Sequence, residues 1–244
     1  MMKPVIYPRR QAIRRVLKAS IHAAFRVLTD FEIQGQEKVP QQGPVIIAGN
    51  HFSYADSVAM IRLAPPTIEF FAGSNPAFTP TWAEFLPRLW GVYYVRRGSV
   101  SRRALRAAES VLNQDGLFGI FPEGGAWAEM IRPARPGAAY LAARTGAPVL
   151  PVAFTGFRDI FPLRFRDQAQ VRIQVGDPIG PFHTTGRGRE RRQQLDEIGD
   201  DIMRAIADML PDKLRGPYSS DPAVREEARE VADYPWQDAD WNEV

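Results

Sequence analysis

His51 is the residue best suited to move a proton, because it directly follows a short run rich in β-branched residues at 44–50. Open α/β sheets place ligands and reactive groups just beyond the carboxyl ends of their strands, so this position favours a functional histidine. Asp56 follows five residues later. If His51 lies in a loop and Asp56 in the first turn of the next helix, the carboxylate can accept from Nδ1 and leave Nε2 as a general base.

A purely structural interpretation of Asp56 stays open. Ser53 and Asp56 also fit the S-x-x-D capping pattern, in which Asp56 serves only the start of a helix. The other two histidines, His22 and His183, are distant in sequence, and no metal-ligand spacing such as H-E-x-x-H occurs. We therefore expect no metal catalysis, and the pair of His51 and Asp56 needs support from other segments.

Three further segments end like strands that deliver functional groups to the same edge of a sheet. The first ends in two arginines, the second in a carboxylate followed by glycines that permit close backbone approach, and the third in a glycine. They read G-V-Y-Y-V-R-R at 91–97, F-P-E-G-G at 121–125 and V-L-P-V-A-F-T-G at 149–156.

Four blocks in this order resemble the PlsC-type lysophospholipid acyltransferase family. They are N-H-x-x-x-x-D at 50–56, G-x-x-x-x-R at 91–96, F-P-E-G at 121–124 and V-x-P-V-A-x-x-G at 149–156. The segment R-P-A-R-P-G-A-A-Y-L-A at 132–142 also resembles the family's helix start, in which a basic residue precedes a glycine. The resemblance covers residues 31–177.

The resemblance implies transfer of a fatty acyl group from acyl-CoA or acyl carrier protein to a lysophospholipid hydroxyl, in phospholipid biosynthesis. The first candidate acceptor is 1-acyl-glycerol-3-phosphate, which would give phosphatidic acid. His51 would be the general base and Asp56 its orienting partner, with no cofactor beyond the acyl donor. The same resemblance assigns the acceptor side to Arg96, Glu123, Gly124 and Arg135. Glu123 could instead be a structural carboxylate that pairs with a buried arginine.

The chain departs from the family where the usual F-P-E-G-T-R-S would continue, because it has Gly125, Ala126 and Trp127. One cationic contact with the head group is absent, so either Arg132 or Arg135 replaces it or the acceptor is a less charged lysolipid or glycolipid. A thioester or lipid hydrolase is a weaker alternative, since no G-x-S-x-G elbow occurs. A nucleic-acid or lipid-binding module is weaker still, and we expect no nucleic-acid partner.

The periodicity of apolar residues predicts the elements that position these groups. Short apolar runs predict strands at 44–50, 68–71, 92–95, 117–121, 149–154 and 171–175, and amphipathic patterns predict helices at 54–63, 102–113, 137–144 and 189–210. Alternating strands and helices are typical of an α/β fold. We therefore expect a largely parallel, mixed sheet with helices on both faces.

An amphipathic, basic helix is predicted to precede the sheet at residues 9–28. Its apolar residues recur at steps of three or four, and its stripe could face a lipid headgroup region or the domain's own core. They are Ile13, Leu17, Ile21, Phe25 and Leu28. We expect three parts: residues 1–30 as a candidate membrane interface, 31–216 as the acyltransferase domain and 217–244 as a loosely packed acidic tail.

Composition sets outer limits on the protein. The chain has 244 residues, a formal net charge of +3 and no cysteine, which excludes a disulfide scaffold, thiolate metal sites and a cysteine nucleophile. No run approaches the roughly 18 apolar residues that a membrane span needs, and the start does not follow the pattern of a signal peptide. We therefore expect a cytoplasmic protein, peripheral on the inner face of the membrane.

Overall fold

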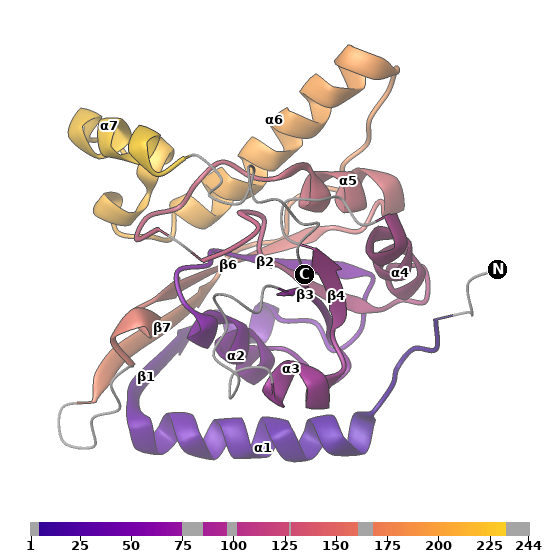
Figure 1. The fold of residues 1–244 in the computed structure, drawn as a ribbon, viewed down its shortest axis with the longest axis vertical. Coiled ribbons are helices and arrows are strands. Elements are labelled where there is room, and N and C mark those ends of the chain that lie inside the picture. The colour runs from indigo at the N-terminus through magenta and orange to yellow at the C-terminus, as the bar shows by residue number, and fades with distance from the viewer. Residues whose placement is uncertain (1–4, 75–84, 97–101, 127, 161–167, 233–244) are drawn as a thin grey trace, which may run out of the picture.

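A seven-stranded sheet forms the centre of the molecule in the computed structural model, which describes residues 5–74, 85–96, 102–126, 128–160 and 168–232 (Figure 1). The strand order is β1-β7-β6-β2-β5-β3-β4. The strands are β1 (Thr29–Gln34), β2 (Val45–Gly49), β3 (Glu69–Ser74), β4 (Tyr93–Arg96), β5 (Leu117–Ile120), β6 (Val149–Thr155) and β7 (Ala169–Val175). Among the strand pairs of the described residues, only β6–β7 is antiparallel, so the predicted largely parallel, mixed sheet is confirmed.

Helices cover both faces of the sheet, as predicted (Figure 1). One face carries α1 (Gln11–Leu28), α2 (Tyr54–Leu63) and α3 (Phe85–Trp90), and the other carries α4 (Arg102–Leu112), α5 (Pro136–Thr145) and α6 (Gly188–Ala207). Neighbouring residues of a strand point to opposite faces. Ile47 of β2 accordingly belongs to the core under α1 and α2, whereas Ile46 belongs to the core under α5 and α6.

One strand and two α-helices were not predicted from the sequence. β1 was not predicted, although the alternation of polar and apolar residues in T-D-F-E-I-Q is typical of a half-buried strand, and it pairs with β7 along its whole length. The short helix α3 was also not predicted. Helix α7 (Pro222–Glu230) lies in the segment expected to be a loose tail; Asp221 caps it and Ala228 is buried. The tail aromatics Tyr234, Trp236 and Trp241 lie outside the described residues.

The apolar stripe of α1 faces mainly the domain's own core. Ile21 and Phe25 are buried there and Leu17 packs against them, whereas Ile13 is 48% exposed. Of the two orientations that the sequence allowed, the structure thus has the one in which the stripe covers the sheet. A membrane contact by this helix would have to use its opposite face.

Buried ion pairs attach α1 to the far edge of the sheet. The carboxylate of Glu69, at the start of β3, is fully buried and accepts from Nη2 of Arg14 at 2.9 Å and from Nε and Nη2 of Arg9 at 3.0 and 2.7 Å. The guanidinium of Arg14 also lies over the ring of Trp90, 5.0 Å from its centroid. Because both guanidinium groups bind this buried carboxylate, the start of α1 is fixed to the domain.

Candidate active site

His51 and Asp56 lie in contact just beyond the carboxyl end of β2. Nδ1 of His51 is 3.3 Å from Oδ2 of Asp56, and the His51 ring stacks on Phe121 with centroids 4.1 Å apart. Asp56 is 1% exposed and the His51 side chain 11%. With Nδ1 directed at the carboxylate, Nε2 is the nitrogen left for an external proton, which is the arrangement of a general base.

Asp56 also caps α2, as the S-x-x-D pattern predicted, while it contacts His51. Its Oδ2 accepts from the backbone N–H groups of Phe52 at 2.6 Å and Ser53 at 2.7 Å, and the Ser53 side chain accepts in return from the N–H of Ala55. Burial raises the pKa of Asp56, while the hydrogen bonds from His51 and the two backbone groups oppose that rise. The capping bonds hold the carboxylate in the position from which it contacts the imidazole.

Glu123 ties the His51 loop to the loop that follows β5. Its Oε1 accepts from the backbone N–H of His51 at 2.7 Å, and its Oε2 accepts from the backbone N–H of Arg132 at 3.1 Å. Nη2 of Arg132 lies 3.2 Å from the same Oε2 and donates to the carbonyl of Gly125. Glu123 and Arg132 are each 1% exposed. Both carboxylate oxygens are thus engaged inside the protein.

The electrostatics of Glu123 reflect this burial. Loss of solvent raises the pKa of its carboxyl to about 7, although Arg132 and the two backbone N–H groups favour the ionised form. Because the N–H of His51 donates to Glu123 and the N–H of Gly124 donates to Phe121, neither amide is available to an oxyanion.

Asn50 links β2 to its other neighbour, β6, and is fully buried. Its amide nitrogen donates to the carbonyl of Phe154 at 2.9 Å, and its Oδ1 accepts from the N–H of Phe154 at 2.7 Å. The side chain of Asn50 thus fixes the end of β2 to β6, and the next residue, His51, is held by Glu123 through its backbone N–H. Motif matching gave Asn50 no role of its own, and only the pairing of β2 with β6 reveals one.

Comparison with known proteins connects this geometry with a family. The family model described as Acyltransferase matches residues 30–155, which include His51, Asp56 and Glu123. This chain belongs to the acyltransferase family. The PlsC-type resemblance that the four motifs indicated is thereby confirmed.

Several relatives are named for one substrate class. A putative 1-acyl-sn-glycerol-3-phosphate acyltransferase of Caenorhabditis elegans is 28% identical, over 71% of this chain and 62% of that protein. The mouse 1-acyl-sn-glycerol-3-phosphate acyltransferase alpha is 24% identical, over 65% of this chain and 58% of that protein. The chain thus spans about three fifths of the length of these curated relatives.

The fold is similar to that of PlsC, the 1-acyl-sn-glycerophosphate acyltransferase of Thermotoga maritima. The crystal structure of that protein matches with a TM-score of 0.55 and 20% identity, covering 80% of this chain and 79% of that one. At this identity the likeness supports the fold alone, and it agrees with the mixed sheet described above.

The remaining predicted site residues of the acyltransferase lie at the end of β4 or beside the F-P-E-G turn. Arg96 is the last residue of β4, and its side chain and Arg97 lie outside the described residues. Gly124 is exposed and has a φ of 82°, a conformation that favours glycine. Arg135 is the N-cap residue of α5, and its N–H donates to Pro122 at 2.8 Å. Arg135 is therefore held next to the F-P-E-G turn.

Arg132 differs from what a head-group ligand would require. Only 1% of the residue is exposed, and its guanidinium lies against Glu123 and Gly125 inside the domain. Of the two arginines that could replace the missing family contact, Arg135 is the one that is partly exposed.

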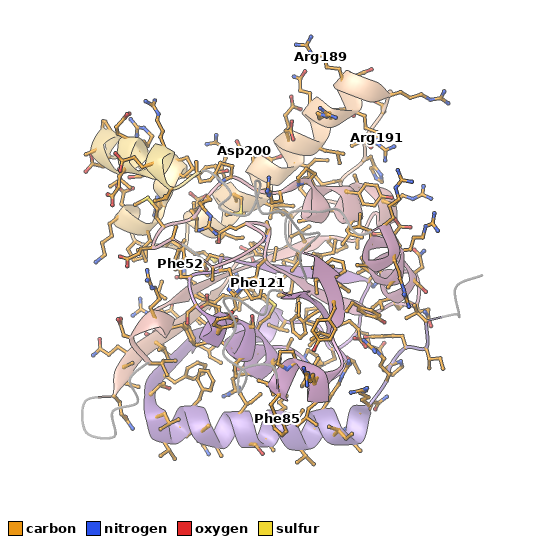
Figure 2. The ribbon with its side chains drawn as sticks, viewed as in Figure 1. Phe52, Phe85, Phe121, Arg189, Arg191 and Asp200 are labelled. Carbon is orange, nitrogen blue, oxygen red and sulfur yellow. The ribbon has the colours of Figure 1, made fainter. Side chains whose placement is uncertain are left out.

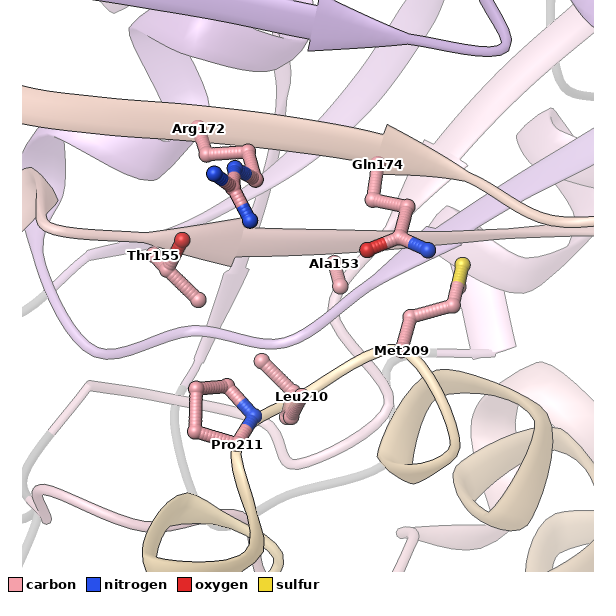
Figure 3. A pocket seen from close by; sticks show the side chains of 7 residues that line it. All are labelled: Ala153, Thr155, Arg172, Gln174, Met209, Leu210 and Pro211. Carbon is pink, nitrogen blue, oxygen red and sulfur yellow. The ribbon is translucent and has the colours of Figure 1, made fainter.

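A pocket of about 200 Å³ lies between β6, β7 and the turn after α6 (Figure 3). Its lining combines the ends of β6 and β7 with the turn after α6, and it contains none of the predicted site residues. The residues are Ala153, Thr155, Arg172, Gln174, Met209, Leu210 and Pro211. Among the described residues, no group of three or more His, Asp or Glu side chains could hold a metal ion.

Proposed function

We propose that this acyltransferase transfers a fatty acyl group from acyl-CoA or acyl carrier protein to a lysophospholipid hydroxyl. The first candidate acceptor is 1-acyl-glycerol-3-phosphate, giving phosphatidic acid in phospholipid biosynthesis. The observation that carries this proposal is the buried contact of His51 with Asp56 at the carboxyl end of β2. The names of the relatives support the acceptor class.

In the proposed step, Nε2 of His51 takes the proton of the acceptor hydroxyl while that oxygen attacks the thioester carbonyl carbon. The tetrahedral intermediate then collapses, the C–S bond breaks, and the imidazolium returns its proton to the leaving thiolate. Asp56 holds the ring and stabilises the imidazolium. A positioned base contributes about 10²- to 10⁴-fold to the rate. A free thiol has a pKa of about 8.5, so the thiolate leaves readily.

The acceptor side of the site is assigned to Arg96, Arg135, Glu123 and Gly124. We propose that Arg96 and Arg135 face the phosphate, because a guanidinium donates to two phosphate oxygens at once. Glu123 and Gly124 would shape the turn beneath it, since both oxygens of Glu123 already accept from protein groups. The enclosed guanidinium of Arg132 supports the alternative of a less charged lysolipid or glycolipid.

The acceptor is a lipid, so the proposal includes peripheral contact with a membrane surface, on its cytoplasmic side. Among the described residues, no helix is both long and apolar enough to cross a bilayer. The contact must therefore come from a surface of the folded domain or from segments outside the described residues.

Product analysis tests the proposed reaction. The protein is incubated with a long-chain acyl-CoA and, separately, with 1-acyl-glycerol-3-phosphate, lysophosphatidylcholine or a monoacylated glycolipid, and the lipids are identified by mass spectrometry. We expect a diacylated product, most abundant with 1-acyl-glycerol-3-phosphate. Preference for an uncharged acceptor would replace the phosphate assignment. Free fatty acid as the sole product, whatever the acceptor, would establish a hydrolase and refute acyl transfer.

A further inference from the structure

The chain between α6 and α7 packs against the loop that follows β5 and carries Glu123. We call this segment, residues 208–221, the α6–α7 connector. It contains two short 3₁₀ helices, Asp212–Leu214 and Gly216–Tyr218. The matched family region ends at residue 155, so the connector lies well outside it.

Two contacts join the connector to this loop at Ile131, which is fully buried. The carbonyl of Leu214 accepts from the N–H of Ile131 at 2.9 Å. Gly216 is also buried, and it lies so close to Ile131 that a Cβ on it would be only 2.2 Å from the carbonyl oxygen of Ile131. The contact therefore requires glycine, and the φ of 51° at Gly216 favours glycine as well.

The carbonyl of Ile131 belongs to the same peptide group as the N–H of Arg132. That group is planar, so a shift of its carbonyl also turns its N–H. The N–H of Arg132 donates to Oε2 of Glu123 at 3.1 Å, and Oε1 of Glu123 accepts from the N–H of His51 at 2.7 Å. One peptide group and one carboxylate thus connect Gly216 with the backbone of His51.

The connector is itself held in place by polar contacts. Oδ2 of Asp212 accepts from the hydroxyl of Ser219 at 2.7 Å, which closes the turn between the two 3₁₀ helices. The ring of Tyr218 packs against α6, where the guanidinium carbon of Arg204 lies 5.4 Å from its centroid. Burial and a hydrogen bond with Asp200, labelled on α6 in Figure 2, raise the pKa of Tyr218. These contacts fix the connector to α6, so it offers the loop a firm support.

We propose that the α6–α7 connector is a positioning element of the active site, with Gly216 as its positioning residue. By fixing the peptide group between Ile131 and Arg132, the connector holds Glu123 where that carboxylate binds the backbone of His51. The inference rests on the proposed function for the role of His51, because a general base must lie within hydrogen-bond reach of the proton that it takes.

Gly216→Ala tests the proposal against a matched variant, Gly35→Ala. Both glycines have a positive φ, 51° and 75°. At both, a Cβ would overlap a backbone carbonyl oxygen, that of Ile131 at 2.2 Å and that of Val175 at 2.6 Å. Gly35 follows β1, which is three places from β2 in the strand order. The two variants should therefore lower the midpoint of urea unfolding by similar amounts.

Acyl transfer should separate the two variants under conditions in which both are folded. A displacement of about 1 Å at a catalytic group costs about 10²-fold, so kcat should fall by about that factor in Gly216→Ala, with the KM for acyl-CoA unchanged. Gly35→Ala should keep the wild-type kcat. A second variant, Asp212→Ala, opens the turn of the connector without adding an atom, and it should lower kcat by a smaller factor.

Hydrogen exchange of the His51 amide gives a measurement that needs no substrate. The chain has three histidines, so isotope labelling of histidine gives three backbone amide signals in NMR spectra. The His51 amide should exchange slowly in wild type and in Gly35→Ala. It should exchange about tenfold faster in Gly216→Ala, as expected for the loss of one hydrogen bond. The amide of His22, within α1, should be unchanged in all of them.

A kcat loss confined to the connector variants, together with faster exchange of the His51 amide, supports the proposal. Equal kcat losses in Gly216→Ala and Gly35→Ala would overturn it, and so would unchanged exchange of the His51 amide in Gly216→Ala. If the wild-type protein transfers no acyl group, the proposed function fails, whereas the exchange rates still decide whether the connector holds His51. The two failures are therefore distinguishable.

Discussion

The loops around His51 and the outward face of α1 differ in how their charged side chains are paired. At the first, Glu123 pairs with Arg132 and accepts hydrogen bonds from two backbone N–H groups. Asp56 contacts His51 and also accepts from two backbone N–H groups. At the second, burial and neighbouring cations lower the pKa values of Lys18, His22 and Arg62. The difference also occurs within one helix, because Arg14 on the inner side of α1 pairs with Glu69 while its neighbour Arg15 donates to a glutamine.

The two regions differ in whether their charges are paired within the folded chain. An ion removed from water needs its counter-charge within the chain, because an uncompensated buried charge costs several kcal/mol. A half-exposed cation tolerates the lack of one, since solvent and salt screen it. A buried charge with its counter-charge in the chain therefore indicates that the pair positions neighbouring groups. A surface charge without a counter-charge indicates a place where a charged partner could bind.

Asp56→Asn is expected to cause the largest loss of activity. This variant separates the two roles of Asp56, orienting the imidazole and capping the helix. The amide oxygen can still accept from the backbone of α2, but the charge that stabilises the imidazolium is gone, so kcat should fall by about 10²- to 10⁴-fold. Ser53→Ala is the control, because it removes the other half of the capping box and should cost only about 1 kcal/mol of stability with kcat retained. Equal kcat losses in the two variants would mean that Asp56 acts only as a cap.

Glu123→Ala is expected to have the next largest effect. It leaves the buried guanidinium of Arg132 without its carboxylate and the N–H of His51 without its acceptor, so unfolding free energy should fall by about 3 to 5 kcal/mol in urea titrations. The exposed pair of Glu32 and Arg172 is the contrast, with side chains 48% and 55% exposed. Glu32→Ala should cost less than about 1 kcal/mol. Similar losses would show that burial does not separate the two classes of pair.

The raised pKa of Glu123 predicts a pH dependence of stability. The folded protein holds the proton up to about pH 7, whereas the unfolded chain releases it near 4.5. The contribution is therefore fully present below about pH 4.5 and is lost as pH rises to 7. It amounts to about 3 kcal/mol. Urea titrations across this window should show that slope in wild type and its absence in Glu123→Gln. A slope of opposite sign would mean that the pairing with Arg132 outweighs burial.

The smallest effect concerns Lys18 on the outward face. Its folded pKa of about 8 lies below the ordinary 10.5, so the folded state releases its proton first and stability should rise between these pH values. The rise should be small, because the ammonium is partly exposed, and it should be missing in Lys18→Gln. Thermal unfolding in this range measures it. A slope that is the same in wild type and in Lys18→Gln would contradict this prediction.

Local sequence patterns predict the strand ends from which the site residues follow. The runs at 44–50 and 117–121 predicted two parallel strands, and parallel strands bring their carboxyl ends to one edge, so the neighbourhood of His51 and Glu123 followed. The start of α2 was likewise readable from Ser53 and Asp56, and it lies where the pattern predicted.

The remaining features depend on contacts between residues far apart in sequence. β1 is short and largely exposed, and its place in the sheet comes from pairing with β7, which lies far along the chain. The orientation of α1 depends on which face meets Phe31 and Phe157, which contact Phe25 across the chain. The burial of Arg132 depends on Glu123 nine residues earlier, and a surface arginine has the same local pattern.

The most direct test of the central claim is the rate of thiol release from a long-chain acyl-CoA, with and without 1-acyl-glycerol-3-phosphate, in wild type and His51→Ala. If His51 takes the proton of the acceptor hydroxyl, the acceptor should accelerate release in wild type, and the variant should lose that acceleration by about 10²- to 10⁴-fold while still binding the acceptor. Acceptor-dependent release that survives in His51→Ala at the wild-type rate would contradict the account.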